Sequence, residues 1–194
     1  MKNNILRSFL LAFTLFLLGN SAYGQDPAFS QFYSNPLYLN PAFAGANNNG
    51  CPTTNLNYRD QWPGIGRTYV TYSASYDQHV DALGGGIGLM VAQDQSGSGN
   101  LNTLHASLLY SYLLEVNREF TVKAGFEASY RSLNLDWSNL TFGDMIDPTY
   151  GFIYNTQEDI INNASNVNFP DFSTGVLGYT EKMYFGFSAH HLTQ

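Results

Sequence analysis

The stretch from Glu119 to Leu135, EFTVKAGFEASYRSLNL, has two faces of opposite character when it is drawn as an extended strand. Successive side chains of a strand point to opposite sides, so alternate residues share a face. One face carries Phe120, Val122, Ala124, Phe126, Ala128 and Tyr130, and the other carries Thr121, Lys123, Gly125, Glu127, Ser129 and Arg131. The stretch is much longer than the roughly five or six residues usual in a strand. Its length and alternation fit a transmembrane barrel strand, which crosses the hydrocarbon in about 9 to 11 residues with an apolar outer face.

Three charged residues on the polar face are candidate lumen-facing residues. Lys123, Glu127 and Arg131 follow one another at intervals of four, so they share one side of the strand and alternate in sign. A polar lumen can hydrate or pair such charges. The alternative is the solvated outer face of a soluble sheet.

The preceding stretch, Leu101 to Val116, repeats the alternation, although Leu109 and Leu113 interrupt its polar face. The junction Glu115 to Glu119 is charged and contains Asn117, which is typical of a tight solvated turn. We therefore predict that the two stretches form a hairpin of the kind that ends in a short periplasmic turn.

Seven stretches are predicted as strands from their alternation and the turn residues between them. They are Thr53–Asp60, Arg67–Asp77, Gly84–Gln93, Leu101–Glu115, Glu119–Leu135, Phe172–Thr180 and Met183–Leu192. A long connection, Asp136 to Asp171, suits an extracellular loop. The sequence thus predicts an all-β fold, an antiparallel transmembrane β-barrel of the outer-membrane type formed by residues 51–194. Because single-chain bacterial barrels have an even number of strands, we expect the barrel to be incomplete, with its C-terminal part missing; a miscounted strand is the alternative.

Residues 1–24 have the pattern of a secretory signal peptide, with Lys2 and Arg7, an apolar run from Phe9 to Leu18, and a small-residue cleavage site ending at Gly24. Their removal leaves six basic and fifteen acidic residues, a formal charge of −9. This acidity argues against nucleic acid as a partner. Charged residues are 12% and aromatic residues 15% of the chain, which suits an exported β protein with aromatic girdles.

Residues 25–50 form an N-terminal segment rich in aromatic residues and in Asn-Pro pairs, which favour turns. The segment is too aromatic for a free linker, so we expect it to dock. It is either a plug packed in the barrel mouth or lumen, or a contact for a partner. The residues chosen as candidates for this plug or contact are Asn35, Pro36, Tyr38, Asn40, Pro41, Phe43 and Gly45.

No catalytic or metal-binding arrangement is predicted, and no cofactor is expected. The run Gly84 to Gly88 lacks the spacing of a nucleotide loop, and its small residues instead suit the close approach of a side chain or plug. His190 and His191 would point to opposite faces of a strand and so could not share an ion. The sequence therefore gives no support for an enzyme.

The N-terminal segment closely resembles the PorP/SprF family of type IX secretion system membrane proteins. The resemblance rests on Gln25–Phe32 (QDPAFSQF) and Asn35–Gly45 (NPLYLNPAFAG), with further similarity at Tyr58–Pro63 (YRDQWP) and Ser188–Thr193 (SAHHLT). Together these motifs lie near both ends of the chain that follows the predicted signal peptide.

The resemblance implies an outer-membrane barrel that serves protein export, including the export or surface attachment of cargo such as gliding adhesins. It implies as partners the periplasmic ring of the secretion apparatus, built from a lipoprotein and its partner, together with secreted cargo and outer-membrane lipid. Family members are typically longer than this chain. Two other functions are left open by the residues themselves: a diffusion porin for small solutes, and a soluble secreted β-sandwich that binds a ligand.

Overall fold

The computed structural model describes residues 26–27, 29–47, 51–64, 69–97, 101–117, 119–137, 140, 142–154 and 166–193. The predicted signal peptide, residues 1–24, lies outside the described residues. Seven strands form one antiparallel sheet in the order β1-β2-β3-β4-β5-β8-β9. Their bounds are β1 (Thr53–Gln61), β2 (Tyr69–Val80), β3 (Gly85–Ser96), β4 (Leu101–Glu115), β5 (Thr121–Leu135), β8 (Asn166–Tyr179) and β9 (Tyr184–Ala189).

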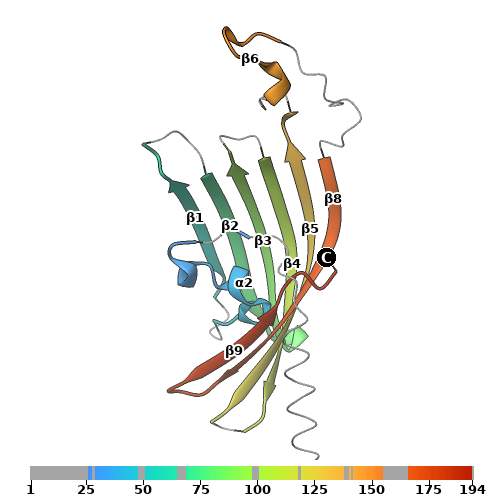
Figure 1. Cartoon of the computed structure of the whole chain (residues 1–194). Helices are drawn as coiled ribbons and strands as arrows, with labels where there is room; N and C mark the ends of the chain where they lie inside the picture. Colours follow the sequence, from blue (N-terminus) through green and yellow to red (C-terminus); the bar gives the residue numbers. More distant parts are fainter. Residues whose placement is uncertain are drawn as a thin grey trace, which may run out of the picture.

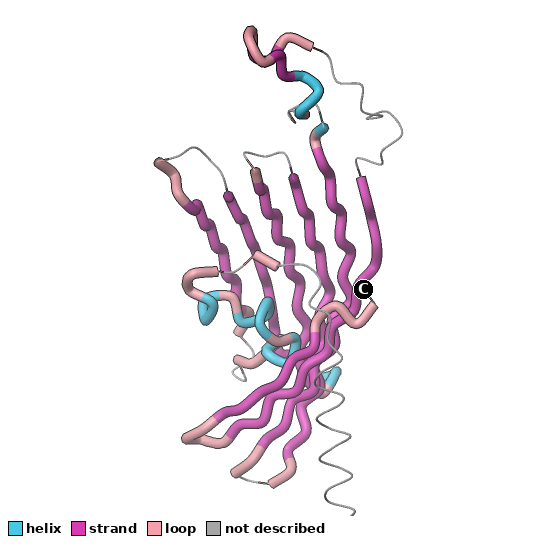
Figure 2. Tube along the Cα trace, in the orientation of Figure 1, coloured by secondary structure: helices cyan, strands magenta, loops and turns pink. Residues whose placement is uncertain are grey.

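The sheet curves around the N-terminal segment as an open half-barrel (Figures 1 and 2). Strands β1 and β9 are its two edges, and each pairs with a single neighbour. Every pair of neighbouring strands in the sheet is antiparallel. The predicted all-β, antiparallel fold of the barrel class, incomplete in this chain, is confirmed.

The two faces of the sheet have opposite composition. We call the face that carries the N-terminal segment the inner face and the opposite face the outer face. Polar side chains are buried on the inner face, among them Ser73, Ser75, Asp77, His105, Ser107, Ser111, Lys123, Glu127, Ser129, Asp171 and Ser173. Large apolar side chains such as Leu108, Phe126 and Tyr130 are exposed on the outer face. This inverts the arrangement of a soluble sheet and matches a barrel wall that faces lipid.

Aromatic pairs lie at both ends of the strands. Trp62 and Tyr69, at the β1–β2 connection, have ring centroids 5.9 Å apart, and Phe120 and Phe185, at the opposite end, stack at 6.0 Å. Aromatic girdles at the two membrane interfaces have this placement. Among the described residues, no helix has the length and apolar character required to cross a membrane.

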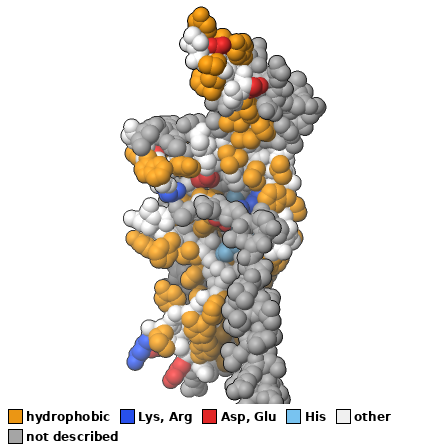
Figure 3. Space-filling view, viewed as in Figure 1, with side chains coloured by type: hydrophobic (Ala, Val, Ile, Leu, Met, Phe, Trp, Pro, Cys, Tyr) orange, Lys and Arg blue, Asp and Glu red, His pale blue; other side chains and the backbone are white. Residues whose placement is uncertain are grey.

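The two ends of the sheet also differ in their connections. The connections 81–84, 116–120 and 180–183 are short and lie at one end, which we call the short-turn end. The longest connection, 136–165, lies at the other end, where a small hairpin formed by β6 (Ile146–Asp147) and β7 (Gly151–Phe152) projects beyond the sheet (Figure 1). On this hairpin, hydrophobic side chains are mixed with acidic ones (Figure 3).

Several predicted boundaries were wrong. Strand β8 begins at Asn166, within the predicted loop, and that loop also contains the β6–β7 hairpin. Pro170 lies inside β8, where it pairs with Tyr130 of β5 on one side. It is tolerated because β9 pairs only with Thr174–Tyr179, so β8 has an unpaired edge at Pro170 that needs no N–H donor.

The predicted last strand, Met183–Leu192, was too long, because β9 ends at Ala189. His190 and His191 therefore lie after the strand, and the expectation that they alternate across a sheet was wrong. A β-sandwich requires two large sheets packed face to face. The described residues instead form one large sheet with an exposed apolar face, which does not support the soluble sandwich.

Candidate functional site

The N-terminal block, residues 29–47, lies along the inner face: its start faces Asn57–Asp60 of β1, and its Gly45 end lies near the short-turn end. Its path is set by two Asn-Pro pairs, each of which starts a helical turn. The helix α2 (Pro36–Leu39) follows Asn35, and the 3-10 turn η2 (Pro41–Phe43) follows Asn40; a third turn, η1 (Phe32–Ser34), precedes them. Proline suits the first helical position because it needs no hydrogen-bond partner for a backbone N–H there. The side chain of Asn40 caps η2 by accepting a hydrogen bond from the Ala42 N–H at 2.8 Å.

Glycines of three strands provide the surface on which the block rests. A Cβ atom on Gly86 of β3 would lie 2.2 Å from the carbonyl oxygen of Ala44, and one on Gly125 of β5 would lie 2.2 Å from the Ala42 nitrogen. On Gly175 of β8 it would lie 2.0 Å from Asn40 Oδ1. We call these three residues the glycine seat. Its backbone approaches the block more closely than any side chain would allow.

Two buried charges hold the end of the block. Lys123 of β5 is 0% exposed, and its Nζ donates to the carbonyl oxygens of Ala44 and Gly45, both at 2.9 Å. Asp77 of β2 is also buried, and its Oδ2 accepts from the Gly45 N–H at 2.9 Å. Gly45 has a φ of 58°, which only glycine adopts without strain. The peptide groups on either side of Gly45 therefore satisfy a buried cation and a buried anion, which would be costly without partners.

Further hydrogen bonds connect the block to other strands. Ser111 of β4 donates to the Ala44 carbonyl at 2.7 Å, and Asn35 Nδ2 donates to Ser73 Oγ of β2 at 3.1 Å. Asn40 Nδ2 donates to the carbonyl oxygens of Val176 and Phe187, in β8 and β9, at 3.3 and 3.1 Å. The block is thus bonded to strands from β2 to β9.

A small apolar core lies beneath the block. Leu37 and Ala44 pack with Met90 of β3 and Leu109 of β4, and all four are buried. Tyr38 and Phe43 pack against this cluster. Leu109, which interrupts the polar face in the sequence, is apolar because it contacts the block. The close approach expected at Gly84–Gly88 is confirmed, since a Cβ on Gly88 would contact both Leu37 and Leu109.

The candidate residues of the N-terminal segment occur together in this block. Asn35, Asn40, Pro41 and Gly45 are buried, whereas Pro36, Tyr38 and Phe43 are partly buried. Burial raises the pKa of Tyr38 above its usual range, and its protonated hydroxyl donates to the Pro27 carbonyl at 2.9 Å. The choice between plug and partner contact stays a prediction. Sequence reasoning missed Asp77 and Ser111, and no local signal marks either of them.

The three candidate lumen residues all lie on the inner face. Lys123 is occupied by the block, and Glu127 is 2% exposed with its Oε1 3.4 Å from Nε2 of His105. Arg131 donates to Asp26 Oδ1 at 3.0 Å. Their predicted lumen-facing role stays a prediction, but the structure separates them: they do not pair with each other through any of the described ion pairs.

A charged cluster joins the start of the described chain to its end. The ring nitrogens of His191 lie 2.6 Å from Asp26 Oδ2 and 2.6 Å from Asp171 Oδ2. Burial alone would raise the pKa of Asp26, but the hydrogen bonds from Arg131 and His191 outweigh it and hold this pKa below its usual range. We call Asp26, Arg131, Asp171 and His191 the charged cluster. His191 was not among the predicted site residues.

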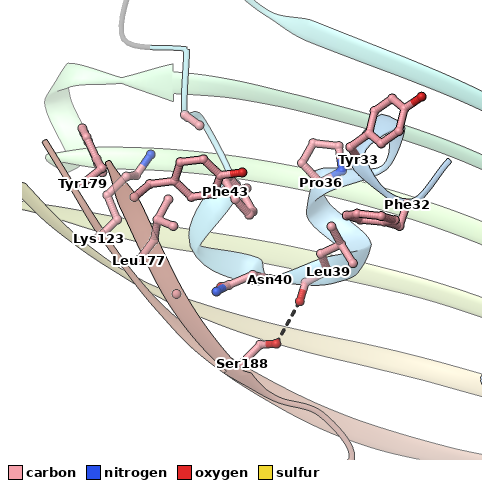
Figure 4. Close-up of a pocket in the computed structure, with 13 residues that line it drawn as sticks. Phe32, Tyr33, Pro36, Leu39, Asn40, Phe43, Lys123, Leu177, Tyr179 and Ser188 are labelled. Atoms are coloured by element: carbon pink, nitrogen blue, oxygen red, sulfur yellow. Dashed lines mark hydrogen bonds between the residues drawn. The ribbon is translucent and has the colours of Figure 1, made fainter. Parts of the chain in front are cut away.

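A cavity of about 530 Å³ opens between the block and strands β5, β8 and β9. Figure 4 shows Phe32, Tyr33, Pro36 and Leu39 on its block side, and Lys123, Leu177, Tyr179 and Ser188 on its strand side. Ser188 Oγ donates to the Leu39 carbonyl at 2.9 Å. Phe32 and Tyr33 are 60% and 68% exposed, so this rim presents aromatic surface outward.

No group of three or more His, Cys, Asp or Glu residues is arranged to hold a metal ion in the part of the chain that the structure describes. Lys123, Asp77 and Ser111 of the inner face instead bind the backbone of the block. Such an arrangement fixes a segment in place, and its exposed aromatic rim is suited to contact with another protein.

Comparison with known proteins identifies the family. The family model described as "Type IX secretion system membrane protein PorP/SprF" matches residues 21–194. No curated protein and no solved structure matches the chain. The match extends over the N-terminal block and all seven strands of the sheet, and we conclude that this chain belongs to the PorP/SprF family of type IX secretion system membrane proteins.

Proposed function

We propose that the chain belongs to an outer-membrane barrel of the type IX secretion system that assists the export or surface attachment of cargo proteins, gliding adhesins among them. The exposed apolar outer face and the buried polar inner face support a place in the outer membrane. Residues 51–194 supply the wall, and residues 25–50 supply the docked segment.

The single observation that carries the proposal is the position of the N-terminal block. Its Gly45 end is bonded to the inner face near the short-turn end, and short turns of bacterial barrels face the periplasm. Phe32 and Tyr33 line one cavity with Tyr179 and Tyr184, which flank the short connection 180–183, so the proposal has them face the compartment that holds the ring of the secretion apparatus, a lipoprotein and its partner. Exposed aromatic residues are enriched where proteins bind one another.

The β6–β7 hairpin is a second contact in this proposal. It projects from the opposite end, where barrel loops face the exterior, and exposes Tyr150 and Phe152. Asp147 fixes its turn by accepting from the N–H groups of Thr149 and Tyr150 at 2.8 and 3.0 Å. This hairpin is the proposed contact for cargo outside the cell.

The test compares exposed with inward-facing aromatic residues of the block. The variant Phe32→Ala/Tyr33→Ala removes two side chains that are 60% and 68% exposed and whose rings lie 5.7 Å apart at the rim of the cavity, so insertion is expected to be unchanged. Secretion of cargo is expected to fall several-fold, as measured in culture fluid. Phe43→Ala is the matched variant that removes packing within the block and is expected to impair insertion as well.

Fractionation and heat-modifiable migration on gels measure insertion in the same strains. Normal secretion by inserted Phe32→Ala/Tyr33→Ala would contradict the partner contact and leave the block as a plug. Liposome swelling tests the diffusion porin separately. Rapid solute flux through the wild-type protein would favour that function over export.

A further inference from the structure

The Asp26 carboxylate contacts side chains of the sheet and its end through both of its oxygens, as the carboxylate of a bound ligand would. Its carboxylate accepts from Nη1 of Arg131 at 3.0 Å through one oxygen and lies 2.6 Å from Nε2 of His191 through the other. Arg131 belongs to β5 and His191 follows β9, so both donors come from the sheet and its end. Asp26 comes from the opposite end of the sequence and is partly exposed, with a side chain at 37%. The contact therefore joins the sheet and the segment that follows β9 to the start of the described chain.

The two donors are held in place without Asp26. Asp171 is 1% exposed and lies 2.6 Å from Nδ1 of His191 and 3.6 Å from Nε of Arg131. Its own position is fixed by hydrogen bonds from the Phe172 N–H at 2.9 Å and from Thr193 Oγ1 at 3.1 Å. Because Asp171 orients both side chains, loss of Asp26 leaves a pre-formed pair of donors aimed at one point.

The charge of this pair favours an anion. The ring nitrogens of His191 lie 2.6 Å from carboxylate oxygens of Asp171 and Asp26, and Nε2 also lies 3.4 Å from Nη2 of Arg131. The Arg131 guanidinium is positively charged and its N–H groups only donate, so it favours a negatively charged acceptor at the position of Asp26. Other titratable side chains around the pair are His190, whose ring centroid is 6.4 Å from that of His191, and Tyr38, His105 and Glu127, which line the adjoining cavity. Glu127 faces His105 at 3.4 Å, so it is matched to a different partner.

A cavity adjoins the same point. It has a volume of about 250 Å³, and its lining includes Asp26, Arg131, His190, Tyr38, His105 and Glu127. Nε of Arg131 pairs with Asp171 at 3.6 Å, so the Nη groups are the donors that face the position of Asp26. A guanidinium group can bind a carboxylate through two parallel hydrogen bonds.

We propose that Arg131 and His191 form a binding site for an aspartate or glutamate side chain of an acidic peptide segment from another protein, and that Asp26 occupies this site as an internal competitor. The occupant seen in the structure is itself a peptide carboxylate followed by a proline, which indicates the ligand class. Binding of such a segment displaces Asp26 and loosens the chain as far as Tyr33, while the rest of the N-terminal block keeps its contacts at Lys123 and Asp77.

The test uses the intact protein in detergent and calorimetric titration with N-acetyl-Asp-Pro-Ala-amide. The matched peptide with Asn in place of Asp and sodium acetate are the control ligands. Asp26→Ala is expected to bind the Asp peptide at least tenfold more tightly than the wild type, and Asp26→Ala/Arg131→Gln is expected to lose that gain. Equal affinity of Asp26→Ala and wild type, or equal affinity for the Asn peptide, would overturn the proposal. Acetate binding as tight as that of the Asp peptide would reassign the site to small acids.

A second measurement needs no variant. Excess Asp peptide added to the wild-type protein is expected to speed cleavage by chymotrypsin after Phe29, Phe32 and Tyr33 several-fold, because displacement of Asp26 frees this segment. The Asn peptide is the control and should leave the cleavage rate unchanged. Cleavage that the Asp peptide does not accelerate would show that Asp26 is not exchangeable. Neither measurement depends on the proposed role in secretion.

Discussion

The N-terminal block and the start of the described chain at Asp26 are bound to the same face of the sheet by different means. The block rests on backbone, through the glycine seat, and its charged contacts with Lys123 and Asp77 are buried. Asp26 is bound through its side chain to Arg131 and His191, and these contacts lie nearer to solvent. Contacts to a fixed backbone allow one geometry, whereas exposed charge pairs can exchange partners. The difference suggests a permanent anchor beside a releasable one.

The largest effect is expected from the glycine seat. In Gly125→Val the added side chain would overlap the backbone at Ala42, which cannot move without displacing η2. We expect a loss of about 3 kcal/mol or more in the free energy of unfolding, measured by denaturant titration in detergent. Gly143→Ala is the control, because a Cβ there meets nothing within 4 Å. Equal stability of the two variants would show that the block does not need close approach.

The buried charge pair should give the next effect. Lys123→Met removes the cation that binds the Ala44 and Gly45 carbonyls, and leaves buried Asp77 with the Gly45 N–H but without that positive charge. Breaking a direct buried ion pair costs about 3 to 5 kcal/mol, and these two charges act through Gly45, so we expect a loss of about 3 kcal/mol in the free energy of unfolding. The double variant Lys123→Met/Asp77→Asn removes both charges and should recover part of that loss. A double variant that is as unstable as the sum of the single ones would show that the two residues act independently.

A smaller effect is expected at Asn40. Asn40→Ala removes the cap of η2 and the two hydrogen bonds to the Val176 and Phe187 carbonyls. We expect a loss of about 2 kcal/mol in the free energy of unfolding. Asn35→Ala is the comparison, because the Asn35 side chain does not cap its helix and makes a single described bond, to Ser73. Its loss should be about half as large.

The smallest effect is a pH dependence at Asp26. Its pKa in the folded protein is lowered, so the contact contributes stability above the unfolded pKa, near 3.8, and loses it as pH falls through the lower folded value. We expect amide exchange at residues 29–34, corrected for its intrinsic pH dependence, to accelerate on acidification in that range. In Asp26→Asn this added dependence should be absent. An identical profile in both proteins would locate the titration elsewhere.

The sequence predicts the wall of the fold better than the site. Alternation is a property of neighbouring residues, so the two faces of β4 and β5 and the number of strands in the sheet follow from it. Pro170 and the asparagines before it are typical of turns, so the sequence did not indicate that β8 begins at Asn166. Proline is tolerated there because that edge of β8 does not pair with β9, which only the tertiary structure shows. The exposed or buried state of each face follows from alternation together with length.

The contacts of the N-terminal block join residues far apart in the sequence, so local patterns predict them poorly. Asn-Pro pairs predict a docked segment with turns, but nothing near Lys123 indicates that its partners are backbone carbonyls 78 and 79 residues away. Gly125 and Gly175 have no glycine beside them in the sequence, and only the register that places them opposite one another shows that they form one seat. The charged cluster could be predicted only with the knowledge that β9 ends at Ala189, before His190 and His191. Pairings over such separations are fixed by the assembled sheet.

The glycine seat and the bonds around it also set an order of assembly. Leu39 and Asn40 bond to Ser188 and Phe187 across sequence separations of 149 and 147 residues, and the seat itself is divided among β3, β5 and β8. Contacts over such distances form late, because the chain between them must first be ordered. We therefore expect the N-terminal block to dock on the sheet after the strands have formed, although it comes before them in the sequence. Docking of the block therefore requires that the strands through β9 have already paired.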